Sequence, residues 1–524
     1  MRSPRALHFD TDVAIVGSGF AGSLMALALR AQGRTVTLIE RGHHPRFVIG
    51  ESSTPLANVV LEALCDQYGL SRVRALSTWG SWKRTHPQVG CGLKRGFSFF
   101  HHQPRQTFTD DRTHARQLLV AASPNDDVAD THWYRPEVDH WLVGEAQRAG
   151  VTYLDATALE TMDETSAATV LRGTRNGERV EIGARFVVDA SGARGFCWRA
   201  LGMDDGALRW MPPTEAVYAH FTGVDLWQDI VRAVPGDVDP PYPVDAAAVH
   251  HVFPGGWIWV LRFDNGITSA GAALTSDVAR EVVAADPEAA WTRLLGRLPS
   301  VQAQFAGAQA VAPFVHLPRV AWRAPRVVGR RWAMLPSAAG VIDPLLSTGF
   351  PLTLLGVERL LDTLHTCWDD GAALTDALGR YASATVRELD ATEQLVAALY
   401  THLDDFEMFS QLTLLYFAAA SYSETVRRLG RRERARGFLL CDDEQFGTEM
   451  RACTSEALTR LRAAKRAALL ERIGRAIEPW DVAGLADRSR RRWYPVLAED
   501  LVAARHKVGA TVEEALTLMG AVHA

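Results

Sequence analysis

The sequence predicts an α/β fold, in which a parallel sheet with flanking helices is interrupted by an antiparallel β domain and followed by a helical region. Near the N-terminus, in residues 11–32, an apolar run is followed by a glycine-rich turn and a helical pattern. A β-rich stretch follows at about 208–313, and the residues after 368 have helical apolar periodicity. We therefore expect one sheet domain that is interrupted by a second.

The N-terminal segment has the pattern of a Rossmann-like dinucleotide-binding unit. The apolar run Val13–Val16 predicts a buried strand, and the turn Gly17-x-Gly19-x-x-Gly22 opens a helix. Gly17 permits the tight turn, Gly19 lets the backbone approach a pyrophosphate, and Gly22 lets helix and strand pack closely. A second strand then ends in Glu40, whose carboxylate suits a ribose diol. Because all parts occur in order, we predict a dinucleotide site; a purely structural glycine turn is the weaker alternative.

Composition and charge limit the class of protein. The chain has 524 residues, of which 47% are hydrophobic, so two or three structural units of ~100–200 residues are expected. Its net charge of −5 gives no reason to expect nucleic acid or an anionic membrane as a partner. The six cysteines include no CxxC pair, which favours a reduced cytoplasmic protein without a zinc site, although disulfides remain an open alternative. The sequence has no signal-peptide pattern and no run of ~18 apolar residues, which argues against secretion and a membrane span.

Two connecting segments follow the second strand. The segment Gly50–Pro55 is rich in turn formers and hydroxyls, and it leads into a helix at Leu56–Tyr68. It falls at the carboxyl end of the sheet, where open α/β folds bind ligands, so Glu51 either lines the ligand site or is simply the acid at a helix start. Residues 72–92 are expected to form a loop, either a mobile flap or a plain connection.

Lys94 is the most suggestive ionisable residue. Gly92–His102 is predicted to be a strand because aromatic residues alternate along it, and Lys94 stands at its start. A lysine buried against phenylalanines tends toward a lowered pKa and becomes a usable acid or nucleophile near neutrality. The alternative is a surface lysine whose stem covers the strand. His101 and His102 point to opposite faces, which prevents joint metal chelation, and with His132 they are expected to be ordinary core or surface histidines.

Later strands are expected to return to the first sheet. A helix at about 135–149 has a proline in its first turn, a strand follows at 151–154, and Asn176-Gly177 marks a hairpin. A further strand at 185–189 ends in the small residues Ala-Ser-Gly. The sheet is therefore expected to be assembled from pieces that are not contiguous in sequence.

The stretch 208–313 is predicted to form an antiparallel sheet that makes one wall of a substrate cavity. Its strands are expected at 216–223, 247–253, 256–263 and 268–274, with a turn at 264–266 and helices at about 277–298. Trp257 and Trp259 alternate with apolar residues and therefore share a face, where they either line the cavity or fill the core.

The last part of the chain returns to the first sheet and then becomes helical. A strand is expected at 326–335, and the small-residue loop 336–349 leads into a helix at 350–368, whose N-terminus can bind an anion or a cofactor. The basic runs at 427–436 and 488–492 are expected to be solvated helix faces rather than nucleic-acid contacts. The predicted parts are 10–207 (nucleotide-binding domain, first part, with an insertion), 208–325 (β-rich substrate domain), 326–368 (nucleotide-binding domain, last part) and 369–524 (helical region).

The order of three pieces resembles a known family of flavoproteins. The glycine turn, the mid-chain strand ending in Asp-Ala-Ser-Gly and the late Ile-Asp-Pro loop resemble the FAD-binding domain of the p-hydroxybenzoate-hydroxylase-like flavoproteins, which implies a glutathione-reductase-type FAD-binding fold. More narrowly, residues 10–370 resemble the flavin-dependent halogenases of the tryptophan-halogenase-like superfamily. Four segments carry this resemblance: Gly50–Pro55, Lys94 before Gly-Phe-Ser-Phe, Gly256–Leu261 as a form of the WxWxIP signature, and Asp343–Gly349.

The resemblance implies both the chemistry and the site residues. Reduced FAD reacts with oxygen to give a C4a-hydroperoxide, chloride or bromide attacks it, and hypohalous acid passes through a tunnel to a lysine that faces the substrate, here Lys94. That lysine either donates a hydrogen bond to hypohalous acid or forms a haloamine. The implied cofactor contacts are Gly17, Gly19, Ala21, Gly22, Glu40, Arg41, Ser52, Arg135, Ser337, Asp343 and Gly349. The implied catalytic residues are Lys94 and Glu51, the tunnel residues are Trp257, Trp259, Phe97 and Leu346, and the halide residues are Thr348 and Gly349, with no metal.

The chain departs from the family pattern at three places. The final Ile-Pro of the signature is Leu261-Arg262 here, so Arg262 is expected to face solvent or an acidic substrate. Pro336-Ser337 replaces a Gly-Asp pair whose aspartate contacts the ribityl chain, and the Ser337 hydroxyl would take that place. Leu346 stands where tryptophan halogenases carry a glutamate, which argues against free tryptophan as the substrate.

We therefore expect a halogenase that uses FADH2, oxygen and halide to chlorinate or brominate an electron-rich aromatic compound, free or carrier-bound. A separate flavin reductase is expected to supply FADH2, because no second nucleotide motif occurs in the sequence. An FAD-dependent aromatic monooxygenase is the alternative enzyme. A non-catalytic flavin-binding or reductase-like protein is the third interpretation.

Overall fold

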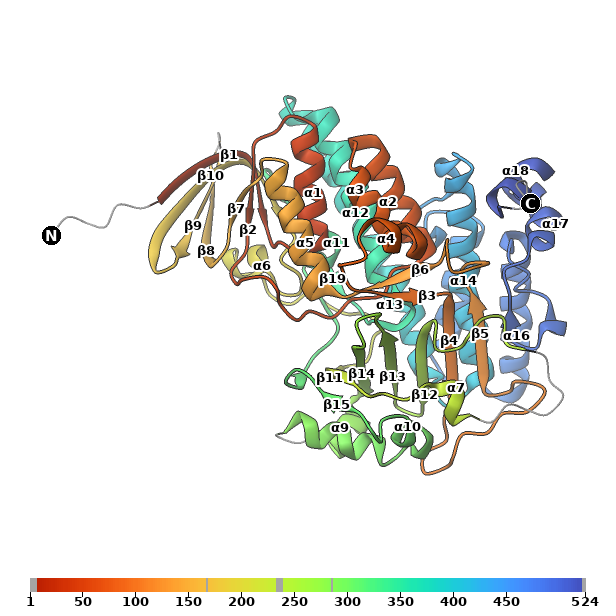
Figure 1. The fold of residues 1–524 in the computed structure, drawn as a ribbon. Coiled ribbons are helices and arrows are strands. Elements are labelled where there is room, and N and C mark those ends of the chain that lie inside the picture. The colour runs from red at the N-terminus through yellow and green to blue at the C-terminus, as the bar shows by residue number, and fades with distance from the viewer. Residues whose placement is uncertain (1–6, 166–167, 232–238, 284–285, 521–524) are drawn as a thin grey trace.

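Two principal β-sheets and the helices around them make up the fold. The computed structural model describes residues 7–165, 168–231, 239–283 and 286–520. In Figure 1 the first sheet stands at the upper left, the second lies below it, and the C-terminal helices are at the right. The predicted α/β class is confirmed by this combination.

The first sheet is parallel around its central strand and antiparallel at one edge. Its strands run in the order β7-β2-β1-β10-β9-β8, and β18 also pairs with β10. The hairpin predicted at Asn176-Gly177 joins β9 to β10, and pieces far apart in sequence make one sheet, as predicted. The strands are β1 (Leu7–Val16), β2 (Val36–Ile39), β7 (Thr152–Leu154), β8 (Thr157–Glu164), β9 (Thr169–Arg175), β10 (Glu178–Asp189) and β18 (Trp332–Met334), the last being shorter than the predicted strand 326–335.

Three helices pack together beside this sheet. Helix α1 (Phe20–Ala31) is buried along most of its length, because it contacts β2 and also packs against α5 (Arg135–Arg148) and α12 (Gly349–Cys367). Figure 1 shows α1 and α12 between the first sheet and the C-terminal helices. Helix α1 is therefore buried from its first turn onward.

Residues 72–92 are not the loop that the sequence predicted. They contain α3 (Ser71–Arg74), the short 3-10 helix η1 (Ala75–Ser77) and α4 (Trp79–Thr85), followed by the start of β3. Thr78 caps α4 by accepting a hydrogen bond from the N–H of Ser81, and the buried Trp82 donates to the carbonyl of Val89. A cap and one buried tryptophan hold a helix that is too short for periodicity to reveal.

The second sheet joins the predicted β-rich stretch to an earlier pair of strands. Its order is β15-β11-β14-β13-β12-β4-β5-β20, with β16 beside β11. The strands from β11 to β14 are antiparallel, as predicted, whereas β4 pairs in parallel with β12. Residues 96–121 thus extend the sheet that residues 214–275 form. The strands are β4 (Gly96–His101), β5 (Gln117–Ala121), β11 (Thr214–Thr222), β12 (Ala248–Phe253), β13 (Gly256–Arg262), β14 (Thr268–Thr275), β15 (Gln309–Ala310), β16 (Val315–Leu317) and β20 (Trp493–Tyr494).

The strand predicted at Gly92–His102 is in fact two strands. β3 (Cys91–Lys94) pairs antiparallel with β6 (Asp130–Trp133), while β4 belongs to the second sheet. Residues 51–53 run along the other edge of β6, where the N–H of Ser53 donates to Thr131 at 3.1 Å. Lys94 is therefore the last residue of a short ribbon, at the point where the chain crosses to the second sheet.

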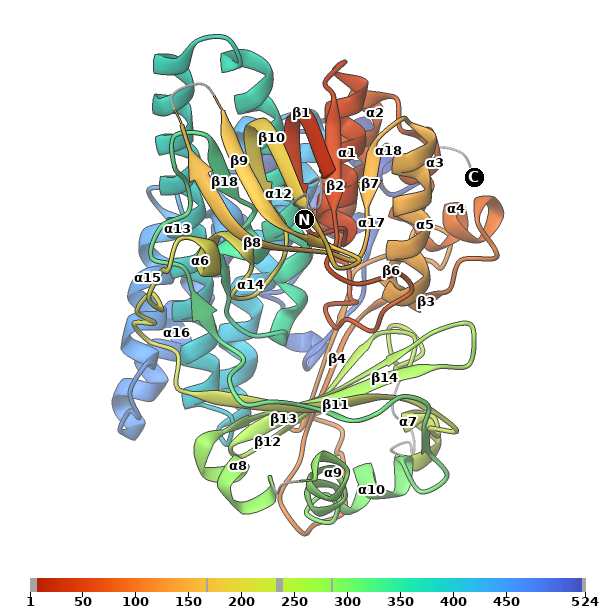
Figure 2. The same ribbon diagram turned by 90° about the vertical axis from the view of Figure 1, so that its left-hand side faces the viewer.

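Alternate residues of the second sheet enter two different cores. On β13, Trp257 and Trp259 belong to the main core, whereas Ile258 and Val260 belong to a smaller one. The prediction that the two indoles share a face is confirmed, and their ring centroids lie 5.7 Å apart. The smaller core is covered by α8 (Ser276–Val282), α9 (Pro287–Leu295) and α10 (Pro299–Gln304), which Figure 2 shows below the sheet.

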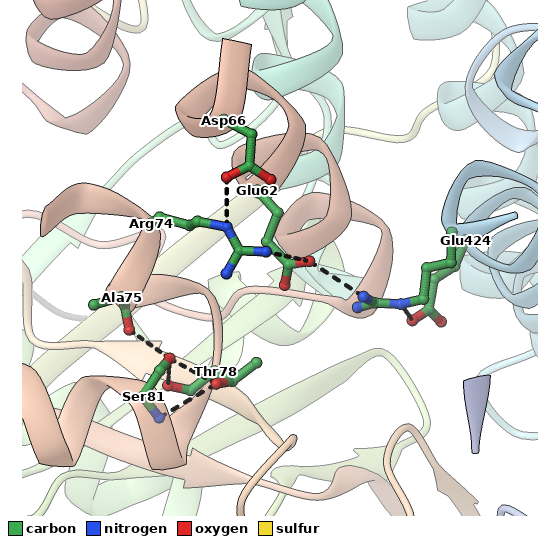
Figure 3. A network of polar contacts seen from close by, with 8 residues as sticks. Glu62, Asp66, Arg74, Ala75, Thr78, Ser81 and Glu424 are labelled. Carbon is green, nitrogen blue, oxygen red and sulfur yellow. Dashed lines mark hydrogen bonds and ion pairs between the residues drawn. The ribbon is translucent and has the colours of Figure 1, made fainter. Parts of the chain in front are cut away.

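The C-terminal helices contribute to the main core. Helix α13 (Gly371–Thr401) packs on α12, and α14 (Phe406–Arg428) packs on α2 (Pro55–Tyr68). An ion-pair network, shown in part in Figure 3, joins α14 to α2. Arg428 of α14 lies 3.2 Å from Glu62 of α2 and 2.7 Å from Glu424 of α14.

The other elements are short or lie at the periphery. Within the described ranges, no helix combines the length and the apolar character that a membrane span requires. The remaining bounds are α6 (Phe196–Ala200), α7 (Trp227–Ile230), β17 (Trp322–Arg323), α11 (Pro336–Ala339), β19 (Gly340–Val341), η2 (Leu345–Ser347), η3 (Arg432–Arg434), η4 (Phe438–Leu440), α15 (Phe446–Ala457), α16 (Ala463–Ile477), η5 (Glu478–Trp480), η6 (Arg488–Arg490), α17 (Ala498–Val508) and α18 (Val512–Leu518).

Candidate active site

The turn between β1 and α1 has the close backbone approaches that its glycines predict. Gly17 has a φ of +104°, and a Cβ there would lie 2.5 Å from the carbonyl oxygen of Ala190. A Cβ on Gly22 would lie 1.9 Å from the carbonyl oxygen of Gly17. Helix α1 begins without a side-chain cap, and Ala21 is buried in its first turn. Its first N–H groups are therefore available to an anion.

Glu40 is buried just after β2 and is held by several donors. Its Oε2 accepts hydrogen bonds from the N–H and the hydroxyl of Ser18 at 3.3 and 3.0 Å, and its Oε1 accepts from the N–H of Gly42 at 3.2 Å. The Arg46 guanidinium lies 3.4 Å away. Burial acts to raise the pKa of Glu40, but Arg46 and these hydrogen bonds outweigh it and lower the pKa overall. The carboxylate therefore stays charged, as binding of ribose hydroxyls requires.

The predicted Arg135, and Arg46, which the sequence analysis missed, flank the start of α1. Arg41 is exposed, whereas Arg46 contacts the Glu40 carboxylate. Arg135 is buried and forms a bidentate pair with Asp139, at 2.9 and 2.8 Å. A Cβ on Gly19 would lie 3.2 Å from the Arg135 guanidinium and 3.7 Å from that of Arg46. Each guanidinium is paired with a carboxylate, Arg46 with Glu40 and Arg135 with Asp139, so the guanidinium N–H groups and the uncapped helix N-terminus are the donors that suit a pyrophosphate.

The segment Gly50–Pro55 lies between this turn and the second sheet. Arg135 donates to the carbonyl of Gly50 at 2.9 Å. The carboxylate of Glu51 is buried and lies 2.8 Å from Nε2 of His220 on β11. The hydroxyl oxygen of Ser52 is buried without a hydrogen-bond partner in the described part of the chain. Glu51 thus connects the segment beside the glycine turn to the second sheet rather than acting only as a helix-start acid.

Lys94 is completely buried between the two sheets. Its Nζ donates to the carbonyl of Ser53 at 2.5 Å and lies 3.8 Å from the centroid of the Phe97 ring. Burial lowers the pKa of Lys94 to about 7, and the Asp130 carboxylate opposes this shift. The alternative of a surface lysine is excluded, because the side chain is 0% exposed. Near neutral pH this lysine is divided between its ammonium and amine forms.

Asp130 is a second buried ionisable residue that the sequence analysis missed. It lies directly opposite Lys94 in the β3–β6 ribbon. Its Oδ1 accepts from Nδ2 of Asn58 at 2.8 Å, and Asn58 Oδ1 accepts from the Ser53 hydroxyl at 2.6 Å. Burial raises the pKa of Asp130 to about 8, and Lys94 opposes the shift. Only the pairing of two strands that are distant in sequence identifies this aspartate.

Aromatic and imidazole rings enclose the lysine. The ring of Phe97 contacts Phe417 and Tyr416 of α14, with centroids 5.1 and 6.3 Å apart. His132 and His250 are fully buried, and burial, assisted by the nearby lysine, lowers the pKa of each to about 3. Both imidazoles are therefore neutral at neutral pH, so the amine is surrounded by uncharged rings.

Asp343 and Trp257 are joined by Tyr400 of α13, which no motif marked. The indole N–H of Trp257 donates to the Tyr400 hydroxyl at 3.1 Å, and that hydroxyl donates to Oδ2 of Asp343 at 2.7 Å. The N–H of Leu345 donates to the other carboxylate oxygen at 2.9 Å. Burial nevertheless raises the pKa of Asp343 to about 7. These contacts connect the loop before α12, strand β13 of the second sheet and helix α13.

The loop before α12 has an unusual backbone. Leu346 and Ser347 have φ values of +67° and +54°, a left-handed conformation that is rare away from glycine. Leu346 and Thr348 are buried, whereas Gly349 is exposed and a Cβ there would meet open space. Helix α12 begins at Gly349 without a side-chain cap, so this N-terminus is also suited to an anion. Ser337 lies nearby in sequence, half-buried in α11.

Two of the singled-out residues are tied to other parts of the protein. Trp259 donates its indole N–H to the hydroxyl of Ser269 at 3.3 Å, across to β14. The Arg262 side chain, predicted to face solvent or an acidic substrate, is 23% exposed and is also held by the protein, because it donates to the carbonyl of Val224 at 2.9 Å and lies 3.4 Å from Asp245. The changed exit of β13 is thus fixed by the protein itself.

The paired histidines point to opposite faces of the sheet, as predicted. His101 on β4 lies 3.1 Å from the carbonyl oxygen of Leu403, whereas His102 lies 3.0 Å from Nδ1 of His251. Burial lowers the pKa of both His101 and His102. Both are buried in separate cores and take their partners there.

Comparison with known proteins decides the family. A model of the FAD-binding domain matches residues 10–216, and a model of tryptophan halogenases matches residues 130–409. The chain belongs to the tryptophan halogenase family. It is an FAD-binding, flavin-dependent halogenase and hence an oxidoreductase, as its resemblance implied.

Individual relatives agree with this assignment. The halogenase is 28% identical over 421 residues to tetracycline 7-halogenase of Kitasatospora aureofaciens, and the matched region covers 78% of this chain and 73% of the relative. It is also 28% identical over 417 residues to monodechloroaminopyrrolnitrin halogenase PrnC of Pseudomonas fluorescens, covering 78% and 70%. The crystal structure of halogenase PltM is similar in fold, with a TM-score of 0.83 and 22% identity over 93% of this chain and 99% of that one.

Proposed function

We propose that this halogenase uses reduced FAD, oxygen and chloride or bromide to halogenate an electron-rich aromatic compound. The observation that carries the proposal is the position of Lys94. Its amine is buried at the end of the β3–β6 ribbon, against the ring of Phe97, and burial lowers its pKa to about 7. An amine that is partly neutral near physiological pH can handle an electrophilic halogen.

The groups around the glycine turn fit FAD. The Glu40 carboxylate would bind a ribose, and the uncapped start of α1 with Arg46 and Arg135 would bind the pyrophosphate. The unpartnered hydroxyl of Ser52 would contact the flavin, beside the buried Glu51. Bound reduced FAD supplies the oxygen activation that oxidises halide, and the protein supplies binding and orientation.

The start of α12 would hold the halide. Helix α12 has 19 residues and no side-chain cap, so its N-terminus carries positive partial charge at the backbone of Thr348 and Gly349. Gly349 leaves open space for an ion to arrive, while the buried Leu346 and Thr348 limit water on the inner side. An incompletely hydrated halide is a better nucleophile than a fully hydrated one, because fewer water hydrogen bonds must break.

Lys94 would then control the oxidised halogen in one of two ways. As an ammonium, it would donate a hydrogen bond to hypohalous acid and polarise the oxygen–halogen bond. As an amine, it would form a nitrogen–halogen bond while the oxygen–halogen bond breaks, and one amine proton would leave with the hydroxide as water. In both cases the rings of Phe97, Tyr416 and Phe417 would keep bulk water away.

We further propose that a separate flavin reductase supplies the reduced FAD. The sequence contains one dinucleotide-binding turn, at Gly17–Gly22, and no second site for a nicotinamide cofactor is marked. The substrate would be an aromatic other than free tryptophan, because the buried Leu346 offers no carboxylate. It would reach the enzyme either free or on a carrier protein.

Mass spectrometry of a panel of electron-rich phenols and indoles tests the proposal. The protein is incubated with FAD, a generic flavin reductase, NADH, oxygen and bromide, and a bromine isotope doublet is the expected product signature. Lys94→Met keeps most of the side-chain volume without the amine, and it should lower the bromination rate at least ~100-fold. Lys465→Met, at an exposed lysine of α16, should retain the wild-type rate.

Two other results would contradict the proposal. Products that gain one oxygen, and that form equally well without bromide, would identify an aromatic monooxygenase. Full bromination by Lys94→Met would remove this amine from the chemistry. Flavin absorbance of each purified variant shows that the comparison is made on FAD-loaded protein.

A further inference from the structure

Lys94 and Asp130 share one buried space. Their exposed fractions are 0% and 2%, and they are directly opposed in the antiparallel β3–β6 ribbon. Opposed residues of such a pair project from the same face, with Cβ atoms roughly 4.5–5.5 Å apart. Each charge acts on the other, because Asp130 favours the ammonium and Lys94 favours the carboxylate.

The groups around the lysine carry no charge of their own near neutral pH. The carbonyl of Ser53 accepts a hydrogen bond from Nζ, and the ring of Phe97 lies against it. His132 and His250 face the lysine from β6 and β12, and both are neutral because burial holds the pKa of each near 3. Among the residues that the structure describes, Asp130 is the only acidic group that acts on Lys94.

The groups around the aspartate are also largely balanced. Glu424 and Arg428 of α14 both act on Asp130, but they lie 2.7 Å apart and form an ion pair with each other. Tyr416 faces it as a neutral phenol, because burial raises its pKa. Asn58 occupies one carboxylate oxygen, whereas the other, Oδ2, is buried without a hydrogen-bond partner in the part of the chain that is described. That oxygen is the one able to carry a proton.

We propose that Asp130 is a positioning residue for halogenation that acts through Lys94, because the two side chains together hold one proton that either can carry. In one arrangement an ammonium faces a carboxylate, and in the other an amine faces a carboxylic acid. No hydrogen bond or ion pair between the two groups is found in the described structure, so the proton that Nζ loses and the proton that the Asp130 carboxylate gains would be exchanged through water. The pair stays neutral overall in both arrangements. The relevance of this device to catalysis rests on the proposed role of Lys94.

Burial explains why such a pair is useful. A net charge in a dry interior is costly. A solitary buried lysine would change the net buried charge each time it gained or lost a proton. Burial moves the pKa of Lys94 down and that of Asp130 up, until the two arrangements are close in energy. The amine form is then available over a range of pH without any change in buried charge.

Lysine-selective NMR tests the proposal directly, because the sequence has only four lysines, Lys83, Lys94, Lys465 and Lys507. The FAD-loaded protein labelled with 13Cε-lysine is titrated, and Lys94→Met assigns the buried signal. The shared proton predicts a broad or two-step titration of Lys94 in the wild type, since coupled groups titrate as a pair. Asp130→Asn keeps the shape and the Asn58 contact, and it should give a single step with a midpoint lower by about one pH unit or more.

A matched control separates charge from packing. Asp481→Asn makes the same change at another buried carboxylate, which accepts hydrogen bonds from the N–H groups of Ala483, Leu485 and Ala486. It should leave the Lys94 titration unchanged. The bromination rate of the wild type should vary little across neutral pH, whereas that of Asp130→Asn should follow the single Lys94 titration.

An unchanged Lys94 titration in Asp130→Asn would overturn the proposal, as would an equal shift in the Asp481→Asn control. If Asp130→Asn does not fold, 13Cγ-aspartate labelling gives the same decision: the carboxyl pKa of Asp130 must rise in Lys94→Met, and a constant value refutes the shared proton. Full bromination by Lys94→Met would reject the proposed role of Lys94, and with it the catalytic role of Asp130. It would leave the shared proton standing, because the NMR titrations do not depend on activity.

Discussion

At the scale of single residues, burial disfavours the charged form of both Glu40 and Lys94, but the surroundings of the two groups give opposite outcomes. Glu40 is buried among N–H donors and beside Arg46, so it remains a carboxylate. Lys94 is buried with one carbonyl acceptor and neutral rings, so its ammonium form is poorly supported. Hydrogen-bond donors and Arg46 therefore preserve the charge of Glu40 against the loss of water, whereas at Lys94 the loss of water prevails and lowers the pKa.

Tyr400→Phe should disturb the late loop more than an ordinary loss of a hydroxyl. The change removes the donor to Asp343 and the acceptor of the Trp257 indole, both of them buried. Unsatisfied buried groups cost about 1–3 kcal/mol, so urea unfolding should show a loss of that size. The KM for bromide should also rise, because Asp343 fixes the start of the proposed halide loop.

A second tyrosine of the same helix serves as the control. Tyr381→Phe removes one buried hydrogen bond, from its hydroxyl to the carbonyl of Met334 at 2.7 Å. It should lower stability by about 1 kcal/mol without changing the KM for bromide. An identical KM in Tyr400→Phe would show that the tyrosine supports packing only.

Local sequence identified some site residues and missed others for a physical reason. Gly17, Glu40 and Lys94 are set by their immediate neighbours, since a turn, a strand end and an aromatic strand are all local patterns. Asp130 and Tyr400 depend on contacts across the fold, one through the β3–β6 pairing and one through the packing of α13. No spacing rule in one sequence reports such contacts.

At the scale of elements, α14 is the cover of the lysine site. Its residues Tyr416 and Phe417 contact Phe97, and its C-terminal end is fastened to α2 by Arg428. The helical character of this region was predictable from periodicity, but its role was not. Apolar periodicity shows that a helix has a buried face without showing what that face covers.

Breaking the Arg428 network should loosen this cover. Arg428→Met leaves Glu424 and Glu62 without their shared cation and should lower the unfolding free energy by about 1–3 kcal/mol, since the pair is partly exposed. Adding Glu424→Gln should recover part of the loss, and the double-mutant cycle in urea measures the coupling. Arg475→Met, at an exposed pair with Glu471, should change stability little, and a similar loss there would contradict the argument.

The helices within residues 72–92 show the limit of periodicity at this scale. Helix α4 has seven residues, fewer than the window in which a 3.6-residue period can be recognised. It is stabilised by the Thr78 cap and by the burial of Trp82, which only the folded chain reveals. The regular strands and the long helices, in contrast, were predicted because each repeats its pattern several times.

At the scale of the whole molecule, stability should depend on pH through the buried Asp343. Its pKa rises from an ordinary 3.8 to about 7 on folding, so the unfolded chain releases this proton first as pH increases. Stability from this residue is therefore lost between about pH 4 and pH 7 and is constant above that. The total loss of unfolding free energy from Asp343 over this pH range is at most roughly 4 kcal/mol.

Comparison of the wild type with Asp343→Asn isolates the contribution of Asp343 to the pH dependence of stability. The unfolding free energy of the wild type, measured in urea with saturating FAD, should fall relative to that of the variant as pH rises through the stated range. Parallel curves for the two proteins would show that Asp343 does not titrate in this way. The comparison also removes contributions from every other buried group, because those are present in both proteins.

The contribution of β4 and β5 to the second sheet determines how halogenases of this kind can be recombined. A chimera that exchanged only residues 208–325 between two parents would seat a new β wall against the old β4, breaking the parallel register of β4 with β12. Residues 91–133 carry β3 to β6, and with them the buried lysine and aspartate. Because the two segments pair within one sheet, an exchange of that sheet between two parents would have to move residues 91–133 together with residues 208–325.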